Sequence, residues 1–224
     1  MTISLLVSDM AGTTVQDDGI VESSFTEALA SMGVGPTDEA YGPALDLVRE
    51  TMGMSKVAVF QMILHDEMAA VRAVAAFEAS IARRIEAGEI GPVPGAVQAL
   101  HEIRAAGIKI VLTTGFSHET RELLVEQLGW HDLVDLSLSP TKTLRGRPYP
   151  DMALHALIEL EIESVREIAT VGDTASDLRA GWNAGASVVA AVLTGAHDRA
   201  TLEAAPHTHI LASITELPAV LSAS

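Results

Sequence analysis

The sequence predicts an α/β protein, with a Rossmann-like, doubly wound parallel sheet as its core and a four-helix cap subdomain inserted into that core. Three observations predict this fold. The apolar run Ile3–Val7 is too short for a helix and ends in a glycine-containing turn, which is typical of a buried parallel strand. Apolar residues then recur at helical spacing as far as residue 87. From residue 95 onward, helical and strand-like segments alternate strictly, as in parallel βαβ units.

The cap is expected to span residues 15–94. A polar loop, 15–20, precedes four stretches of helical periodicity, at about 21–32, 37–50, 55–64 and 69–87. Thr37 and Ser55 are suitable N-caps for the second and third of these helices. Two prolines and two glycines in Glu89–Gly95 mark the end of the cap. Because the chain crosses twice between cap and core, we expect the cap to open and close as a lid.

The core is expected to comprise residues 1–14 and 95–224. In chain order, its second part is predicted to contain helix 96–105, strand 108–112, helix 119–128, strand 133–138, a helix from about 150, strand 167–171, helix 176–183, strand 187–193, a helical turn at 199–204, strand 208–211 and a C-terminal helix. Strands in such an alternation pair in parallel. Their carboxyl ends therefore lie along one edge of the sheet, which is where open α/β sheets bind ligands.

The composition indicates a soluble protein with an aliphatic core. Hydrophobic residues make up 48% of the chain but aromatic residues only 4%, so aliphatic side chains and methionine must fill the interior. The net charge of −16 argues against a nucleic acid or an anionic membrane as the partner. The absence of cysteine excludes disulfides and thiolate metal sites. The first residues lack the basic region of a signal peptide, and we expect a cytoplasmic location.

Polar residues follow three of the predicted strands at the carboxyl edge. Asp9 follows the first strand, Thr114 and Gly115 follow the second, and Asp173 follows the fourth, with Asp177 one helical turn further on. Because the carboxyl ends of parallel strands meet at one edge, we expect these side chains to converge on one small volume. Taken alone, Asp9 is a metal ligand, a nucleophile or a cap for the turn that follows it.

Carboxylates crowded at one edge repel each other, and a divalent cation relieves that repulsion. Mg²⁺ suits such a site best, because it is a hard ion that takes oxygen ligands from a few carboxylates and keeps some of its waters. A carboxylate beside Mg²⁺ is able to act as a nucleophile. Four groups near this edge are suited to hold phosphoryl oxygens: the Thr114 hydroxyl, the backbone N–H groups of Gly12 and Gly115, and the Arg147 guanidinium.

These motifs resemble those of the haloacid dehalogenase (HAD) superfamily of hydrolases. The four motifs of that superfamily match, in the expected order, Asp9–Thr13, Thr114, Arg147 and Gly172–Asp177, and the resemblance extends over the whole chain, cap included. It implies that Asp9 is the nucleophile and forms an aspartyl-phosphate. It also implies that Thr114 and Arg147 bind the transferring phosphoryl group and orient Asp9. Gly12, Thr13 and Gly115 are then expected to adjoin the substrate.

The same resemblance implies a magnesium enzyme. Mg²⁺ would be bound by Asp9, the backbone carbonyl of Ala11 and Asp173, with Asp177 in support. Ala11 is also a departure, because most phosphatases of the superfamily carry there a second aspartate that protonates the leaving oxygen. General acid catalysis of this kind contributes about 10²–10⁴-fold. Either the leaving group needs no proton from this position, or another group supplies it.

The chain is similar in these features to the phosphonatases of the superfamily, which break a C–P bond. Met52-Gly53-Met54-Ser55-Lys56 matches a cap motif whose lysine forms a Schiff base with the substrate aldehyde. The resemblance implies this role for Lys56 and places Met52 and Gly53 beside the substrate. An iminium next to the C–P bond lets the carbon leave as an enamine, without a general acid. Lys56 must be neutral to react, and we expect Met52, Met54 and Phe60 to desolvate it.

The match to the phosphonatases is incomplete. Val57–Val59 occupy the place of a family histidine, Phe116 replaces a tyrosine, and Asp151 replaces a tryptophan. An alternative is therefore a phosphatase for a small phosphate monoester, of the phosphoglycolate or sugar phosphate type, in which Lys56 is a substrate-binding cation. A third interpretation is a binding protein on an inactive scaffold.

The partners follow from these interpretations. The first two require a small phosphonate or phosphorylated metabolite. The resemblance further implies a homodimer formed through the cap.

Overall fold

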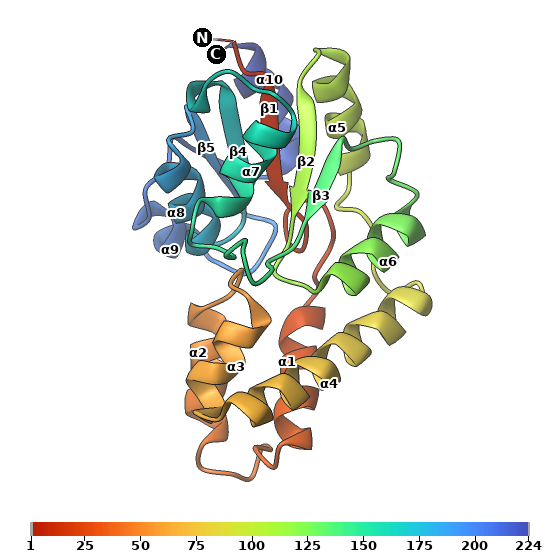
Figure 1. Ribbon diagram of the computed structural model, residues 1–224, viewed down its shortest axis with the longest axis vertical. Helices are drawn as coiled ribbons and strands as arrows, with labels where there is room; N and C mark the ends of the chain where they lie inside the picture. Colours follow the sequence, from red (N-terminus) through yellow and green to blue (C-terminus); the bar gives the residue numbers. More distant parts are fainter. Residues whose placement is uncertain (1, 224) are drawn as a thin grey trace.

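The computed structural model describes residues 2–223, and six of its strands form one sheet in the order β3-β2-β1-β4-β5-β6. The strands are β1 (Leu5–Asp9), β2 (Lys109–Thr113), β3 (Leu136–Leu138), β4 (Ile168–Gly172), β5 (Val188–Val192) and β6 (His209–Leu211). Every neighbouring pair is parallel. Helices flank this sheet (Figure 1), so the predicted Rossmann-like α/β fold is confirmed.

Helices cover both faces of the sheet. They are α5 (Ala96–Ala105), α6 (His118–Leu128), α7 (Asp151–Glu159), α8 (Ala175–Ala184), α9 (Arg199–Glu203) and α10 (Leu217–Ser222), with single 3₁₀ turns at Val165–Glu167 and Ile214–Glu216. Successive residues of β1 point to opposite faces. Leu6 therefore packs in the cluster that includes residues of α5, α6 and α10, whereas Leu5 and Val7 pack in a second cluster with α7. Burial on both faces explains why β1 is continuously apolar up to Ser8.

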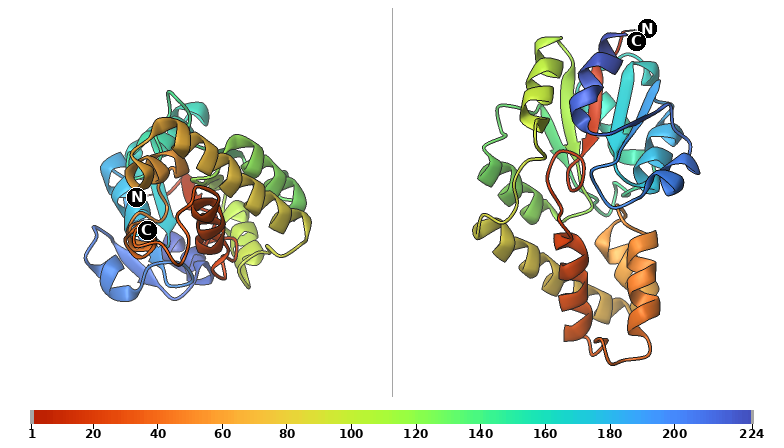
Figure 2. Two further views of the ribbon diagram at one scale, coloured as in Figure 1. Left: turned by 90° about the horizontal axis from the view of Figure 1, so that it is seen from below. Right: turned by 180° about the vertical axis from the view of Figure 1, so that it is seen from behind.

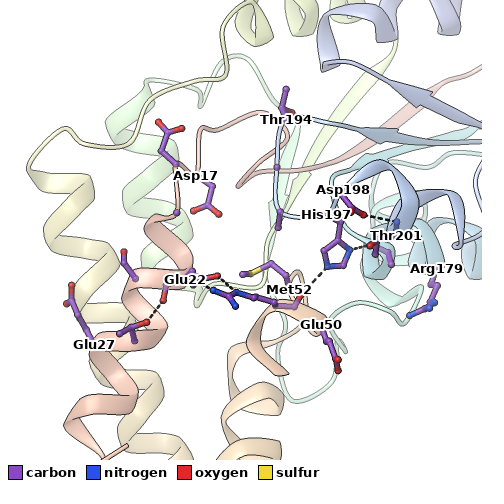
Figure 3. Close-up of a pocket in the computed structure, with 18 residues that line it drawn as sticks. Asp17, Glu22, Glu27, Glu50, Met52, Arg179, Thr194, His197, Asp198 and Thr201 are labelled. Carbon is purple, nitrogen blue, oxygen red and sulfur yellow. Dashed lines mark hydrogen bonds and ion pairs between the residues drawn. The ribbon is translucent and has the colours of Figure 1, made fainter. Parts of the chain in front are cut away.

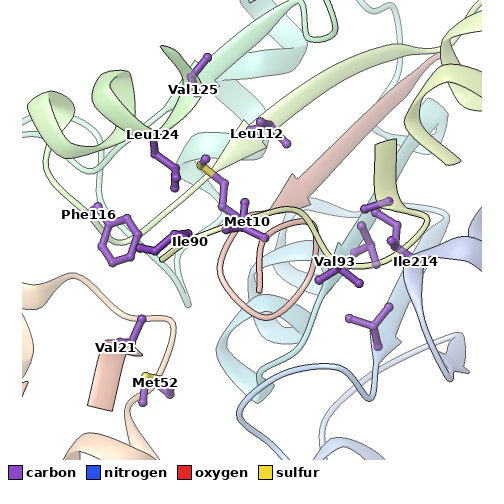
Figure 4. Packing of buried hydrophobic residues seen from close by; sticks show 14 of the residues in the cluster. Met10, Val21, Met52, Ile90, Val93, Leu112, Phe116, Leu124, Val125 and Ile214 are labelled. Carbon is purple, nitrogen blue, oxygen red and sulfur yellow. The ribbon is translucent and has the colours of Figure 1, made fainter. Parts of the chain in front are cut away.

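Four helices lie beyond the carboxyl edge of the sheet (Figures 1 and 2). They are α1 (Ile20–Ser31), α2 (Tyr41–Glu50), α3 (Lys56–Leu64) and α4 (Glu67–Glu86). Phe25 of α1 lies 5.0 Å from Phe60 of α3 and 4.8 Å from Phe77 of α4, measured between ring centroids. These fully buried rings hold the helices together. The apolar cluster runs on into the sheet layer, where Figure 4 shows Met10 and Leu112.

The starts of α2, β3 and α4 differ from the predicted ones by two residues or more. Helix α2 begins at Tyr41 and not at Thr37, because the Asp38 side chain accepts a hydrogen bond from the Ala40 N–H (2.8 Å) and forms a turn there. Strand β3 is shortened to three residues, since the Leu133 N–H donates to the Trp130 carbonyl in a turn. Helix α4 begins two residues early, with Asp66 as its N-cap. Within residues 2–223, every helix is too short or too polar to span a membrane.

Candidate active site

Asp9 lies where the order of strands reverses. Strand β1 is central, and the chain goes from it first to β2 on one side and later to β4 on the other. In the register of the sheet, Asp9 is paired with Thr113, and Ser8 is paired with Val171. Strand register thus brings the residues after three strands together at the switch point, where such sheets bind ligands. Side chains from all three strand ends line one small cavity, called here the inner cavity, which also contains Lys56 and Arg147.

Arg147 joins two of the carboxylates. Its guanidinium is buried, and Nη1 donates to Oδ1 of Asp9 and to Oδ1 of Asp177. The other oxygen of Asp177 accepts from the backbone N–H (3.0 Å) and the hydroxyl (2.5 Å) of Thr174, forming a capping box at the start of α8. Both oxygens of Asp177 are therefore engaged, and Asp177 does not line the inner cavity. The structure places Asp177 against Arg147, and its predicted supporting role at a metal ion stays a prediction.

Asp173 is held from two sides. Its Oδ1 accepts from the Thr13 hydroxyl (3.2 Å), and its Oδ2 accepts from the Ala196 N–H (2.7 Å). A Cβ atom on Gly12 would lie 2.6 Å from Oδ2, so only glycine leaves room for the carboxylate. The Gly12 N–H donates to the Val15 carbonyl (2.7 Å) and is not free to bind a ligand. Gly12 and Thr13, which we expected to adjoin the substrate, instead support Asp173.

The carboxylates of the site raise one another's pKa values. Burial raises the pKa of Asp9 to about 6; Arg147 opposes this shift and Asp177 adds to it. Burial likewise raises the pKa of Asp173 well above its ordinary value, and the negative charges of Asp9 and Asp177 raise it further. Arg147 stays protonated, because its two carboxylate partners outweigh the effect of burial and raise its pKa. The site thus holds more negative charge than its own residues neutralise.

Lys56, the first residue of α3, points into the inner cavity and is only 5% exposed. Its Nζ lies 5.2 Å from the ring centroid of Phe25 and 5.5 Å from those of Phe77 and Phe116. Nζ donates no hydrogen bond to any described residue. Burial, with a further contribution from the positive charge of Arg147, lowers the pKa of Lys56 to about 8. A substantial fraction of the amine is therefore neutral near physiological pH.

The desolvating side chains are not those that we predicted from the sequence. Phe25, Phe77 and Phe116 surround Nζ; they come from α1, α4 and the loop after β2. Met52 lines the inner cavity as expected. Phe60 packs behind the rings of Phe25 and Phe77 and does not face the amine. Sequence spacing could not reveal this cage, because its members are brought together only by the packing of the cap on the core.

The loop before Lys56 rests directly on the core. A Cβ atom on Gly53 would lie 2.5 Å from Oγ1 of Thr174, and one on Gly115 would lie 2.6 Å from the Met54 carbonyl oxygen. Both glycines permit an approach that a larger residue would block. Lys56 lies in the same cavity as Asp9, and Gly53 and Gly115 line that cavity too.

The inner cavity opens toward a larger one. Figure 3 shows this outer cavity, of about 1100 Å³, between the cap helices α1 and α2 and the loop after β5. The inner cavity has a volume of only about 20 Å³, which is room for roughly one water molecule. Asp17, Met52 and Ala196 line both cavities. The inner cavity is too small to hold a substrate, so the structure represents a closed arrangement.

Two polar contacts hold the cap against the core. Glu78 of α4 accepts from the backbone N–H (3.1 Å) and hydroxyl (2.8 Å) of Ser117, at the N-terminus of α6, where a negative charge is stabilised. His197 accepts from the Ala175 N–H at Nδ1 (3.0 Å), and its Nε2 lies 3.1 Å from the Arg49 carbonyl oxygen. Sequence reasoning missed Glu78, His197 and Asp17, because each is an isolated polar residue outside any motif.

The site has the donors that a magnesium ion requires. Within residues 2–223, no three His, Cys, Asp or Glu side chains are arranged as a complete metal cluster. Asp9, Asp173 and the backbone of Ala11 nevertheless adjoin the same inner cavity. Mg²⁺ commonly binds through one or two carboxylates and completes its shell with waters and phosphate oxygens. The all-oxygen donor set and its uncompensated negative charge therefore fit this ion.

The fold and the site indicate a hydrolase, and comparison with known proteins indicates the same class of enzyme. The family model for haloacid dehalogenase-like hydrolases matches residues 3–185, and the chain belongs to this family of enzymes. The phosphonoacetaldehyde hydrolase of Syntrophobacter fumaroxidans is 32% identical over 198 residues, covering 82% of this chain and 70% of that protein.

Solved structures share the fold. A hydrolase from Pseudomonas syringae has a TM-score of 0.84 at 19% identity and covers 98% of both chains. A phosphonoacetaldehyde hydrolase-like protein from Oleispira antarctica has a TM-score of 0.80 at 20% identity, covering 100% of this chain and 92% of that one.

Replacement of Lys56 by methionine is expected to stabilise the protein at neutral pH. Below pH 8 the folded and unfolded states both carry the proton, and burial of the charge lowers the free energy of unfolding by about 3 kcal/mol, at roughly 1.36 kcal/mol per pKa unit. This penalty disappears as pH rises from about 8 to 10.5, because the folded state releases its proton first. Urea unfolding at pH 7 and pH 10 should show a gain for Lys56→Met that shrinks at the higher pH. Exposed Lys142→Met is the control, and an equal stability of Lys56→Met and wild type at pH 7 would contradict the expectation.

Proposed function

We propose that this hydrolase cleaves the C–P bond of a small aldehyde phosphonate of the phosphonoacetaldehyde type. The observation that carries the proposal is the buried amine of Lys56, held without a hydrogen-bond partner among the described residues and in the same cavity as Asp9. A lysine that only bound an anion would function best when protonated, whereas burial lowers the pKa of Lys56 to about 8 and makes neutral amine available for attack. The name of the Syntrophobacter relative supports the same chemistry.

Lys56 at one end of the cavity reacts with the aldehyde, and Asp9 at the other end reacts with the phosphorus. The Lys56 amine attacks the aldehyde carbon, and loss of water gives an iminium. The Asp9 carboxylate then attacks phosphorus, and the electron pair of the C–P bond moves into the iminium to give an enamine. The leaving carbon therefore needs no proton at the instant of cleavage, which explains how Ala11 can replace an acid. A proton from solvent then returns the enamine carbon to the iminium, and water hydrolyses the aspartyl-phosphate on Asp9 and the iminium on Lys56.

Arg147 and the residues beside it orient the phosphoryl group. The bond from Arg147 to Oδ1 of Asp9 fixes the carboxylate and leaves Oδ2 available for attack. The Nε of Arg147 is buried and lacks a partner among the described residues, so a phosphoryl oxygen would satisfy a donor that is otherwise costly to bury. Thr114 and Gly115 line the same cavity and supply further polar groups.

Mg²⁺ is proposed as the cofactor, held by Asp9, the Ala11 carbonyl and Asp173. When bound, the ion supplies positive charge that reduces the repulsion between the Asp9 carboxylate and an anionic substrate. Asp177 contributes indirectly, through its bonds to Arg147.

A phosphatase for a small phosphate monoester is the second candidate. The observation that favours it is the sequence after Lys56, where Val57, Ala58 and Val59 supply no titratable group to assist the Schiff base. In that case Lys56 would bind the distal anion of the substrate as a cation.

Borohydride trapping separates the two candidates. With phosphonoacetaldehyde, the wild type should release acetaldehyde, and borohydride should inactivate it by fixing a two-carbon adduct on Lys56, detectable by peptide mass spectrometry. Lys56→Arg keeps the charge but cannot form the adduct, so it should lose at least about 10³-fold in kcat. Lys56→Met is the uncharged control. Phosphate monoester turnover that survives in Lys56→Arg, with no adduct in the wild type, would favour the phosphatase.

Magnesium should raise the melting temperature of the protein. An ion that binds only the folded state stabilises it by about 2.7 kcal/mol at a hundred times its Kd, and each kcal/mol shifts Tm by roughly 2–4 °C at this size. Asp173→Asn should abolish the shift, because it removes one of the two carboxylate ligands. Asp18→Asn, in an exposed loop position, should retain it. A shift of equal size in Asp173→Asn would place the ion elsewhere.

A further inference from the structure

Asp17 lies at the border between the two cavities. It belongs to the loop between β1 and α1, and it lines the outer cavity (Figure 3). It also lines the inner cavity. Its Oδ1 accepts a hydrogen bond from the Val21 N–H (2.8 Å) at the start of α1, which fixes the side chain. Its Oδ2 accepts no hydrogen bond from the described residues and is free to meet a ligand. The neighbouring Asp18 lines only the outer cavity.

The reaction proposed above still needs a group that transfers protons near Lys56. Five titratable side chains line the inner cavity: Asp9, Asp17, Lys56, Arg147 and Asp173. Asp9 is the proposed nucleophile, Lys56 is the amine that becomes alkylated, and Arg147 keeps its proton between two carboxylates. Both oxygens of Asp173 are engaged by Thr13 and Ala196. Asp17 alone among these five is both unassigned and equipped with a free oxygen.

We infer that Asp17 is a catalytic acid and base for Schiff-base formation at Lys56. This inference rests on the proposed function and assigns to Asp17 the proton transfers for which neither Ala11 nor Val57–Val59 offers a group. Its position at the border between the cavities lets it reach the end of the substrate that is remote from Asp9. Closure of the cap would bring that end between Asp17 and Lys56.

The proton balance of the step is simple. After Lys56 adds to the aldehyde, the carbinolamine carries a hydroxyl group. Protonated Asp17 donates its proton to that hydroxyl oxygen, the C–O bond breaks with its electron pair, water departs, and the nitrogen lone pair forms the C=N bond. After C–P cleavage the enamine carbon takes a proton from solvent to restore the iminium. When water then attacks the iminium carbon, the Asp17 carboxylate accepts the proton from that water and returns to its initial state.

The surroundings of Asp17 suit a group that holds a proton. Burial raises the pKa of Asp17, and the negative charges of Asp18 and Glu22 act in the same direction; the Val21 N–H and Lys56 oppose them. Around Lys56, the charges of Asp9, Glu78 and Asp17 counteract burial and Arg147. Asp17 and Lys56 thus influence each other electrostatically, as expected for two groups that share one cavity.

The test compares Asp17→Asn with Asp18→Asn in the intact enzyme. Asparagine keeps the acceptor for the Val21 N–H but carries no transferable proton, and Asp18→Asn is a matched change one residue further on. In single-turnover experiments with phosphonoacetaldehyde and borohydride, adduct formation on Lys56 should slow by about 10²–10⁴-fold in Asp17→Asn and stay within roughly twofold of wild type in Asp18→Asn. Asp17→Glu should recover part of the rate.

The pH profile of adduct formation adds a signature that a structural role would not produce. In the wild type, the rate should fall as the pH rises through the raised pKa of Asp17, because Asp17 then loses the proton that it donates. In Asp17→Asn the slow residual rate should rise with pH and then level off.

The outcomes separate this inference from the proposed function. If the wild type forms the trapped adduct and Asp17→Asn forms it at the same rate, the proposed role of Asp17 is wrong. The proposal of a Schiff base at Lys56 is then unaffected. No adduct in the wild type overturns the proposed function and this inference with it. If Asp17→Asn does not fold, Asp17→Ser is read in the same way.

Discussion

The structure depends on the charge balance of one buried volume at the carboxyl edge of the sheet. Asp9, Asp173 and Asp177 bring three negative charges, and Arg147 brings one positive charge that bonds two of them directly. A divalent cation at Asp9 and Asp173 would bring the sum to zero. Lys56 would then be a surplus cation, and the charge of the ion would lower the pKa of its amine further. The same balance thus calls for a metal ion at one end of the cavity and a nucleophilic amine at the other.

Closure of the cap maintains this balance. The glycine contacts of residues 53 and 115 bring the cap loop onto the core, and the rings of Phe25, Phe77 and Phe116 then exclude water from the amine. In an open arrangement, Lys56 would regain solvent and its ordinary pKa. On the proposed function, cap closure would activate the amine as the substrate is enclosed, and it would strengthen every charge interaction in the site by removing water. Glu78 and His197 hold the cap by polar contacts that water can replace, which suits a lid that must open in each cycle.

The sequence was informative where chemistry depends on local pattern. The position of Asp9 after a buried strand, and of Thr114 and Asp173 after parallel strands, predicted their convergence at one edge, because parallel register leaves no other arrangement. It was uninformative where tertiary contacts decide. Nothing in the sequence shows that the Gly12 N–H is taken by Val15, or that the rings around Lys56 come from three distant segments. The role of Asp17 was hidden for the same reason, since a polar loop residue acquires meaning only from the cavities on either side of it.

The protonation state of Lys56 is the most direct measure of this account. The chain contains three lysines, at positions 56, 109 and 142, so protein labelled with ¹³C-lysine gives three ε-methylene signals that are titrated in one NMR spectrum. We predict that the Lys56 signal titrates with a midpoint near pH 8, and at a lower pH when Mg²⁺ is added. A midpoint near 10.5, unchanged by Mg²⁺, would show a charged, solvated lysine and would contradict a buried, nucleophilic amine.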